Sequence, residues 1–219
     1  MNGLFSPDSL FVRVMSKAAD LILLNVVFLL TCAPIFTIGA SITALYTVCF
    51  RMGTPREGKL FADYFRAFRD NFRKGTALWL IAVAWIGVTA LNAVLCYSLQ
   101  GALHNMFLLF VMLLVLAVLV FGYAFPLLSQ FENTVKGTMK NALLLSIGYF
   151  PRSLIIGVVN VFPVALLLTN FVGFLRCALI WVAVWFAAAA YGNTMLLRKV
   201  FAPYLSNGER EDDCSENQV

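Results

Sequence analysis

Four asparagines within long apolar runs are the side chains best placed to do chemistry in this chain. Each amide offers two N–H donors and one carbonyl acceptor. In a bundle of apolar helices such groups can line a small polar cavity that recognises the hydroxyls of a solute, or they can hydrogen-bond to a neighbouring helix. We expect helix joining, at about 0.6 kcal/mol for each bond; a polar cavity of a small transporter or channel is the alternative. The four are Asn25, Asn92, Asn160 and Asn193.

Other groups with catalytic or metal-binding chemistry are sparse in the sequence. The single histidine, His104, has no second histidine or cysteine at ligand spacing. The five cysteines form no CxxC pair, so neither a disulfide framework nor a metal site is expected. No glycine-rich phosphate loop or Ser-His-Asp pattern is recognisable. The sequence therefore predicts no enzyme, no catalytic residue, no metal and no cofactor.

The composition indicates that these residues stand in an integral membrane protein. Hydrophobic residues make up 61% of the 219 positions and charged residues only 12%, far from the usual globular balance. With about 20 apolar residues needed for each span, the length accommodates five or six helices and no separate soluble domain. The net charge of +5 is spread over loops between apolar runs, so no nucleic-acid partner is expected.

Charged side chains avoid the centres of the apolar runs. Asp20 lies at the start of one run and Arg176 at the end of another. Insertion of a charged residue at a helix centre costs about 2.5 to 3.5 kcal/mol, and such residues mark ion or proton pathways. Their absence from the centres weakens the hypothesis of an ion-coupled transporter.

Residues 51–74 form the longest charged segment, and they contain seven of the sixteen lysines and arginines. Because positive residues stay on the cytoplasmic side of membrane proteins, we expect this amphipathic segment in the cytoplasm. A second cytoplasmic segment, 129–152, carries Lys136, Lys140 and Arg152.

The second half of the first segment has helical periodicity, with phenylalanines spaced by four, three and four residues and arginines pointing away from them. Such a helix can dock a cytoplasmic partner or bind anionic lipid, and lipid anchoring is the commoner role of amphipathic helices. The candidate docking residues are Phe61, Phe65, Arg66, Phe68, Arg69, Phe72 and Arg73.

The first apolar run, Leu21 to Phe50, is too long for one straight span and too short for two. Pro34 removes a backbone donor in the middle of the run. We expect one long span, kinked or broken near Pro34; the alternative is a re-entrant hairpin turning there, which would bring Arg13 and Lys17 to the cytoplasmic side. Small residues should pack this segment against another helix. The predicted packing motif is Pro34, Gly39, Ala40, Ser41, Thr43 and Ala44.

Four further apolar runs complete the predicted topology. They are Ala77–Leu99, Met106–Leu128, Ser153–Thr169 and Leu175–Leu197. The sequence therefore predicts an all-α, polytopic transmembrane bundle of about five spans, forming a single domain over 1–205 with a cytoplasmic C-terminus. Residues 206–219 are polar and acidic, which is typical of a disordered tail.

Several motifs resemble the YesL family of bacterial integral membrane proteins of unknown function. They include PIFTIGAS from Pro34, DYFRAFR from Asp63 and FPR from Phe150. The resemblance covers about Phe5 to Tyr204, and it implies a multi-pass protein of the cell membrane, often encoded beside carbohydrate uptake systems. The function it suggests is an accessory or regulatory component of carbohydrate uptake. The bilayer and subunits of a carbohydrate uptake transporter would be its partners.

Overall fold

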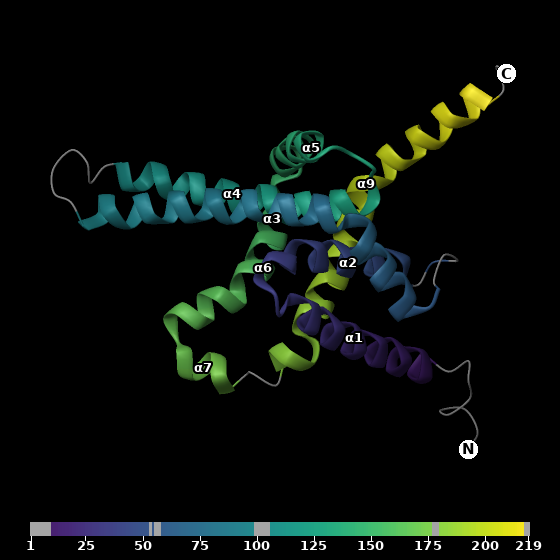
Figure 1. The fold of residues 1–219 in the computed structure, drawn as a ribbon, viewed down its shortest axis with the longest axis horizontal. Helices are drawn as coiled ribbons and strands as arrows, with labels where there is room; N and C mark the ends of the chain where they lie inside the picture. Colours follow the sequence, from purple (N-terminus) through teal and green to yellow (C-terminus); the bar gives the residue numbers. More distant parts are fainter. Residues whose placement is uncertain (1–9, 53, 55–57, 99–105, 177–179, 217–219) are drawn as a thin grey trace.

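The computed structural model of the chain describes residues 10–52, 54, 58–98, 106–176 and 180–216 (Figure 1). The described residues form helices and contain no strand, which confirms the all-α class. The elements are α1 (Leu10–Cys32), a 3-10 turn η1 (Ile35–Thr37), α2 (Ile38–Arg51), α3 (Leu60–Ser98), α4 (Met106–Gln130), α5 (Val135–Gly148), α6 (Phe150–Thr169), α7 (Phe171–Arg176), a π-helical turn η3 (Trp181–Trp185) and α9 (Phe186–Glu216).

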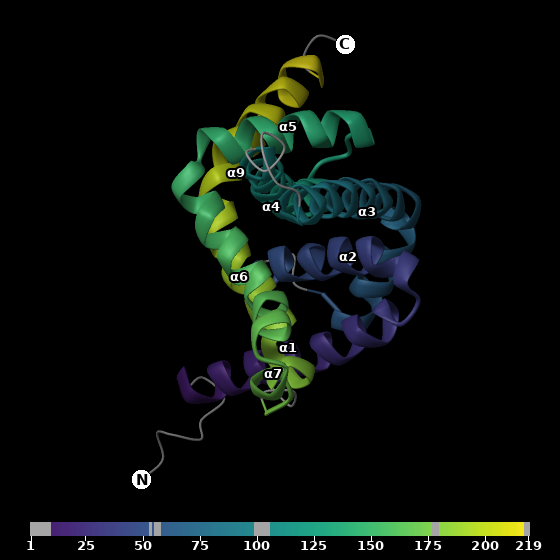
Figure 2. The same cartoon turned by 90° about the vertical axis from the view of Figure 1, so that its left-hand side faces the viewer.

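Helix α2 is the centre of the bundle. Every residue from Gly39 to Phe50 except Ile42 is buried, because α1, α3, α4 and α9 all pack against this helix. Figure 2 shows α2 between α1 and α3. Its 14 residues rise by about 21 Å, which is less than the hydrocarbon thickness of about 30 Å. Helix α2 is therefore too short to cross a membrane alone.

The chain reverses direction at Pro34, so α1 and α2 form a hairpin (Figure 2). Pro34 is extended, with φ −77° and ψ 116°. The Thr37 hydroxyl lies 2.6 Å from both the Thr31 and Pro34 carbonyl oxygens, which ties the turn to the end of α1. The predicted break at Pro34 is confirmed. At this break the chain turns back, so α1 and α2 are two adjacent helices and do not continue as one extended span.

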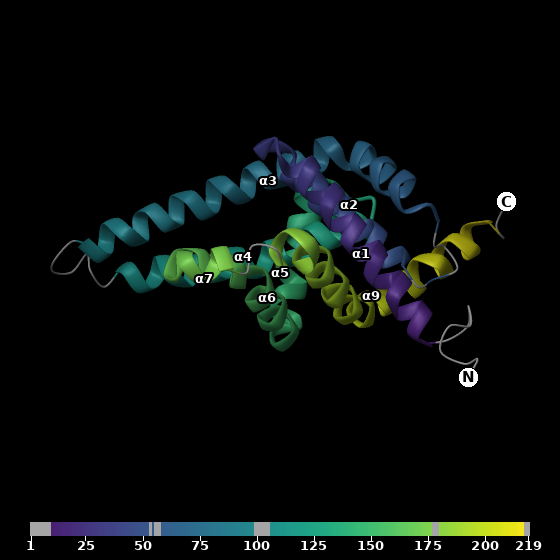
Figure 3. The same ribbon diagram turned by 90° about the horizontal axis from the view of Figure 1, so that it is seen from below.

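Within the described residues, four helices are long and apolar enough to cross a membrane. Helices α3 and α4 pair as a long hairpin whose far end projects beyond the other helices in Figures 1 and 3. Many large apolar side chains on the outer faces are exposed, as expected for a lipid-facing surface. The four candidate spans are Met15–Cys32, Leu60–Ser98, Met106–Gln130 and Phe150–Thr169.

Of the predicted fifth span, Leu175–Leu197, the structure describes 175–176 and 180–197, all of them helical. Helix α7 ends at Arg176, the π-helical turn η3 follows at Trp181–Trp185, and α9 begins at Phe186. Apolar composition does not record the wider hydrogen-bond spacing of a π turn.

Two helix boundaries in the segment 129–152 follow from local chemistry. Thr134 caps α5 by accepting a hydrogen bond from the Gly137 N–H at 3.2 Å, and Pro151 stands in the first turn of α6, where a missing N–H costs little. At the other end of the chain, α9 continues to Glu216. The structure thus gives helix over most of 206–219, where composition predicts disorder; 217–219 lie outside the described residues.

Candidate functional site

Helices α2 and α3 cross in very close contact at two glycines. A Cβ added to Gly39 would overlap the Gly75 carbonyl group and lie 2.6 Å from the Trp79 Cβ. A Cβ added to Gly75 would lie 2.9 Å from the Ala40 Cα. Neither position has room for a side chain, so the crossing requires glycine on both helices.

The predicted packing motif lies at this crossing and along the buried face that follows it. Ser41, Thr43 and Ala44 are buried together with Gly39 and Ala40, whereas Pro34 is exposed in the turn. The hydroxyls of Ser41 and Thr43 donate to carbonyls four residues earlier in the chain, at 3.1 and 2.9 Å. Both hydroxyls therefore donate to carbonyls of their own chain segment.

Three of the four predicted intramembrane asparagines, Asn25, Asn160 and Asn193, connect separate helices. The Asn25 Oδ1 atom on α1 accepts the backbone N–H of Ala187 at 2.9 Å, immediately after the π-helical turn. On α9, the Asn193 Nδ2 atom donates to the Tyr46 hydroxyl at 3.1 Å and to the Asn160 Oδ1 atom at 3.2 Å. The second group links α9 to α2 and α6.

Asn92 lies apart from the other three asparagines. Its Nδ2 atom donates to the Val88 carbonyl of its own helix at 2.7 Å. The structure therefore brings Asn160 and Asn193 together, places Asn25 at a different contact of α9, and leaves Asn92 on α3. This distribution favours helix joining over a shared polar cavity.

Arg198 is a structural residue that the sequence analysis did not identify. Its Nη2 atom lies 2.8 Å from the carbonyl oxygens of both Phe50 and Met52, and 3.4 Å from that of Cys49. The last carbonyls of a helix lack intrahelical donors, and a cation is favourable at this end of the helix dipole. Arg198 thus fixes the end of α2 to α9. A basic residue at the end of an apolar run gives no sequence signal for this role.

An ion pair closes the connection between α2 and α3. The Arg51 Nη1 atom lies 3.3 Å from the Asp63 Oδ1 atom. Close by, the Tyr64 hydroxyl and the Thr31 Oγ1 atom are 2.6 Å apart, which joins the first turns of α3 to the end of α1. These contacts hold the start of α3 against the bundle.

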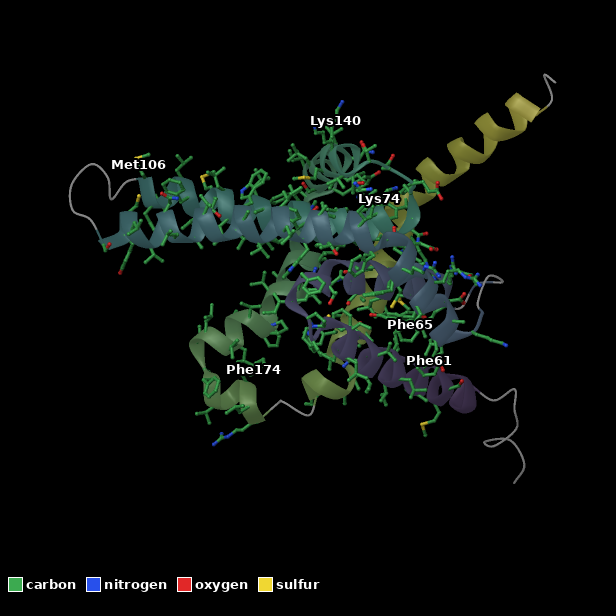
Figure 4. The ribbon with its side chains drawn as sticks, viewed as in Figure 1. Phe61, Phe65, Lys74, Met106, Lys140 and Phe174 are labelled. Carbon is green, nitrogen blue, oxygen red and sulfur yellow. The ribbon has the colours of Figure 1, made fainter. Side chains whose placement is uncertain are left out.

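The predicted docking residues form one exposed surface on these turns, which we call the Phe–Arg face. Tyr64 and Ala67 bury the inner side of the same turns. Three of the phenylalanines remain exposed, Phe61 at 47%, Phe65 at 52% and Phe72 at 38%, and the three arginines are exposed beside them. Figure 4 labels Phe61 and Phe65 on the first turns of α3, far from the end that leads to Met106. The Phe–Arg face comprises Phe61, Phe65, Arg66, Phe68, Arg69, Phe72 and Arg73.

Aromatic contacts order the row of rings. Phe68 is half-buried and stacks on Tyr64 with ring centroids 6.4 Å apart, while Phe65 meets the same tyrosine edge-on at 5.7 Å. Phe72 packs edge-on against Phe68 at 5.6 Å. Because buried Tyr64 anchors these rings, less side-chain entropy is lost when another surface covers them.

The fold defines the class of this protein: a helical, multi-span integral membrane protein. Residues 21–93 match the model of a family described as a protein of unknown function, DUF624. The matched range includes the Pro34 turn, both glycines of the crossing and the Phe–Arg face. No curated protein and no solved structure matches the chain. Among the described residues, no group of three or more His, Cys, Asp or Glu side chains is arranged to hold a metal ion; His104 lies outside them.

Proposed function

We propose that this chain is an accessory or regulatory membrane protein that binds a partner protein through its Phe–Arg face. The observation that carries the proposal is the exposure of three phenylalanine rings on helical turns whose inner side is already packed. An exposed row of large apolar side chains bordered by charge is typical of an interaction site. The role is one of binding, without catalysis.

The chemistry of the Phe–Arg face favours a protein over a lipid surface. Its cations are arginines, which bind carboxylates with two parallel hydrogen bonds and are enriched with aromatic residues at protein interfaces. An open hollow of about 450 Å³ on this face is lined by Phe65, Arg66, Arg69 and Asp70. The Asp70 carboxylate would repel a lipid phosphate at that point. A protein partner can offer an apolar side chain to the hollow and a carboxylate to the arginines.

The cytoplasm is the expected side for this contact. Figures 1 and 3 place the start of α1 and the end of α9 at the same end of the molecule as the first turns of α3. The abundance of lysine and arginine around these turns supports a cytoplasmic location for all three. The resemblance to the YesL family suggests carbohydrate uptake as the process, and a subunit of a carbohydrate uptake transporter as the partner.

Reversing the charge of the Phe–Arg face should release the partner while the protein still folds. All three arginines are exposed and form no ion pair or hydrogen bond with the described residues, so a variant with Arg66→Glu, Arg69→Glu and Arg73→Glu keeps its packing. We expect a mild-detergent pull-down from native membranes to recover a partner with the wild type, and at least tenfold less of it with this variant.

A second triple variant, Lys136→Glu, Lys140→Glu and Lys199→Glu, is the matched control. These lysines are also exposed but lie on α5 and α9, so partner recovery should equal that of the wild type. The docking proposal fails if neither the wild type nor the variants recover a partner. Loss of affinity for anionic vesicles on charge reversal would then assign the face to lipid anchoring. Solute uptake that depends on Asn160 and Asn193 would support the transporter alternative.

A further inference from the structure

A cavity of about 400 Å³ lies between the end of α4, α5 and α9, on elements that take no part in the Phe–Arg face. Its volume falls within the range of small-molecule sites. Phe131 and Phe201 form part of its wall, with their rings edge-on and the centroids 5.7 Å apart. Gly148 and Leu144 contribute from α5. The cavity thus has an aromatic side and an apolar helical side.

Three polar side chains from this cavity's lining have unused hydrogen-bonding groups. The amides of Asn133 and Asn141 and the hydroxyl of Tyr149 make no hydrogen bond to any described residue. Together they offer four N–H donors, two carbonyl acceptors and one hydroxyl. Arg152 lies over the Tyr149 ring, 5.4 Å from its centroid, and so helps to fix that ring in place.

The lining selects for uncharged ligands rich in hydroxyl groups. None of the described residues that line the cavity carries a charge, so nothing in this part of the wall compensates a phosphate or a carboxylate. Amides can donate to a hydroxyl oxygen and accept from a hydroxyl hydrogen, and aromatic rings pack against the C–H face of a polyol. We propose that this cavity binds a neutral polyol, either a free sugar or the sugar headgroup of a glycolipid.

The outer surface of α5 gives the cavity a position at the membrane interface. Lys136 and Lys140 are exposed on its first half, and Figure 4 shows Lys140 pointing away from the bundle. Leu144 and Ile147 on its second half are 61% and 63% exposed. These four residues are spaced by four, four and three, so one face of α5 changes from charged to apolar along its length, as expected where a helix passes from the headgroup region toward lipid. Leu144 belongs to both the exposed surface and the cavity wall, so a glycolipid headgroup could enter from the bilayer.

Gly148→Leu tests the cavity by filling it. A Cβ at Gly148 meets no atom within 4 Å, so the variant should fold. We expect it to weaken binding at least tenfold. Gly87→Leu is the matched control, because Gly87 also has open space but lies on α3; its affinity should equal that of the wild type.

Two probes distinguish the sources of the polyol, with the full-length protein used throughout. Calorimetry with glucose measures binding of a free sugar, and native mass spectrometry with monoglucosyldiacylglycerol against phosphatidylcholine measures retention of a glycolipid. The double variant Asn141→Leu and Tyr149→Phe removes two of the three polar side chains with little change of volume and should also bind at least tenfold more weakly. Binding of either probe that depends on Gly148, Asn141 and Tyr149 supports the site. Binding of neither probe by the wild type, or equal binding by the variants, overturns it. The docking surface is untouched, so the two proposals fail independently.

Discussion

Gly39→Leu is expected to prevent the protein from accumulating as a folded, monodisperse species in mild detergent. The added Cβ alone would overlap the Gly75 carbonyl and approach the Trp79 Cβ to 2.6 Å, and the rest of the leucine has no space because α2 is enclosed on all sides. Overpacking of a dense core costs about 1–3 kcal/mol, and more where backbone must move. Here both obstacles are parts of helix α3 that cannot rotate away. We expect Gly75→Leu to have the same effect from the other side of the crossing.

Size-exclusion profiles and thermal melting of purified variants measure this effect. Gly87→Leu serves as the control on α3, because no atom lies within 4 Å of its Cβ position; this variant should melt within about 2 °C of the wild type, since exposed substitutions usually change stability by under about 0.5 kcal/mol. A Gly39→Leu protein that is as monodisperse and as stable as Gly87→Leu would show that α2 and α3 do not cross at these glycines.

Arg198→Met is expected to destabilise the protein by about 2–3 kcal/mol. The guanidinium donates to the Phe50 and Met52 carbonyls at 2.8 Å, and hydrogen bonds to charged groups contribute about 1.5–3 kcal/mol. Phe50 and Met52 are both buried, so their carbonyl oxygens, once they lose the guanidinium donor, have poor access to water. Methionine keeps much of the apolar stem of arginine, which separates the loss of these bonds from the loss of packing.

The neighbouring Lys199→Met provides a matched control, because Lys199 is exposed. Denaturation followed by the intrinsic fluorescence of the tryptophans, in detergent of fixed composition, compares the two variants with the wild type. Equal stabilities of Arg198→Met and Lys199→Met would rule out a role for the guanidinium at the end of α2.

Apolar run length predicted several helices closely, because burial in lipid needs little beyond hydrophobicity. The predicted run Met106–Leu128 corresponds to α4 at Met106–Gln130, and Ser153–Thr169 corresponds to α6 at Phe150–Thr169. Pro34 predicted the break in the first run, since it lacks a backbone donor. The direction of the chain after the break was not predictable, because it depends on Thr37 bonding back to the end of α1.

Helix α3 shows why the elements of the candidate site were only partly predictable. Its amphipathic start and its apolar remainder predicted two separate helices, but the structure has one helix of 39 residues. Gly75 at the junction serves the crossing with α2 and does not end the helix. Periodicity also identified the Phe stripe, yet the side that packs on the bundle is centred on Tyr64 and Ala67. A helical wheel shows which residues share a face and does not show which face meets a neighbour.

Contacts that single polar side chains make over long sequence separations could not be predicted from the sequence either. Asn25 accepts the Ala187 N–H, and Arg198 reaches the end of α2. Neither pairing leaves a local pattern, because each depends on how α9 is placed by the packing of the whole bundle.

Photocrosslinking in native membranes tests the central claim, that the Phe–Arg face binds a protein. A photoreactive phenylalanine analogue replaces Phe65, which is 52% exposed, and in a second protein it replaces Leu108, which is 66% exposed on α4. The account predicts a discrete protein adduct from position 65. The changes Arg66→Glu, Arg69→Glu and Arg73→Glu should abolish that adduct. Position 108 should give lipid adducts alone. Lipid adducts alone from both positions would contradict it.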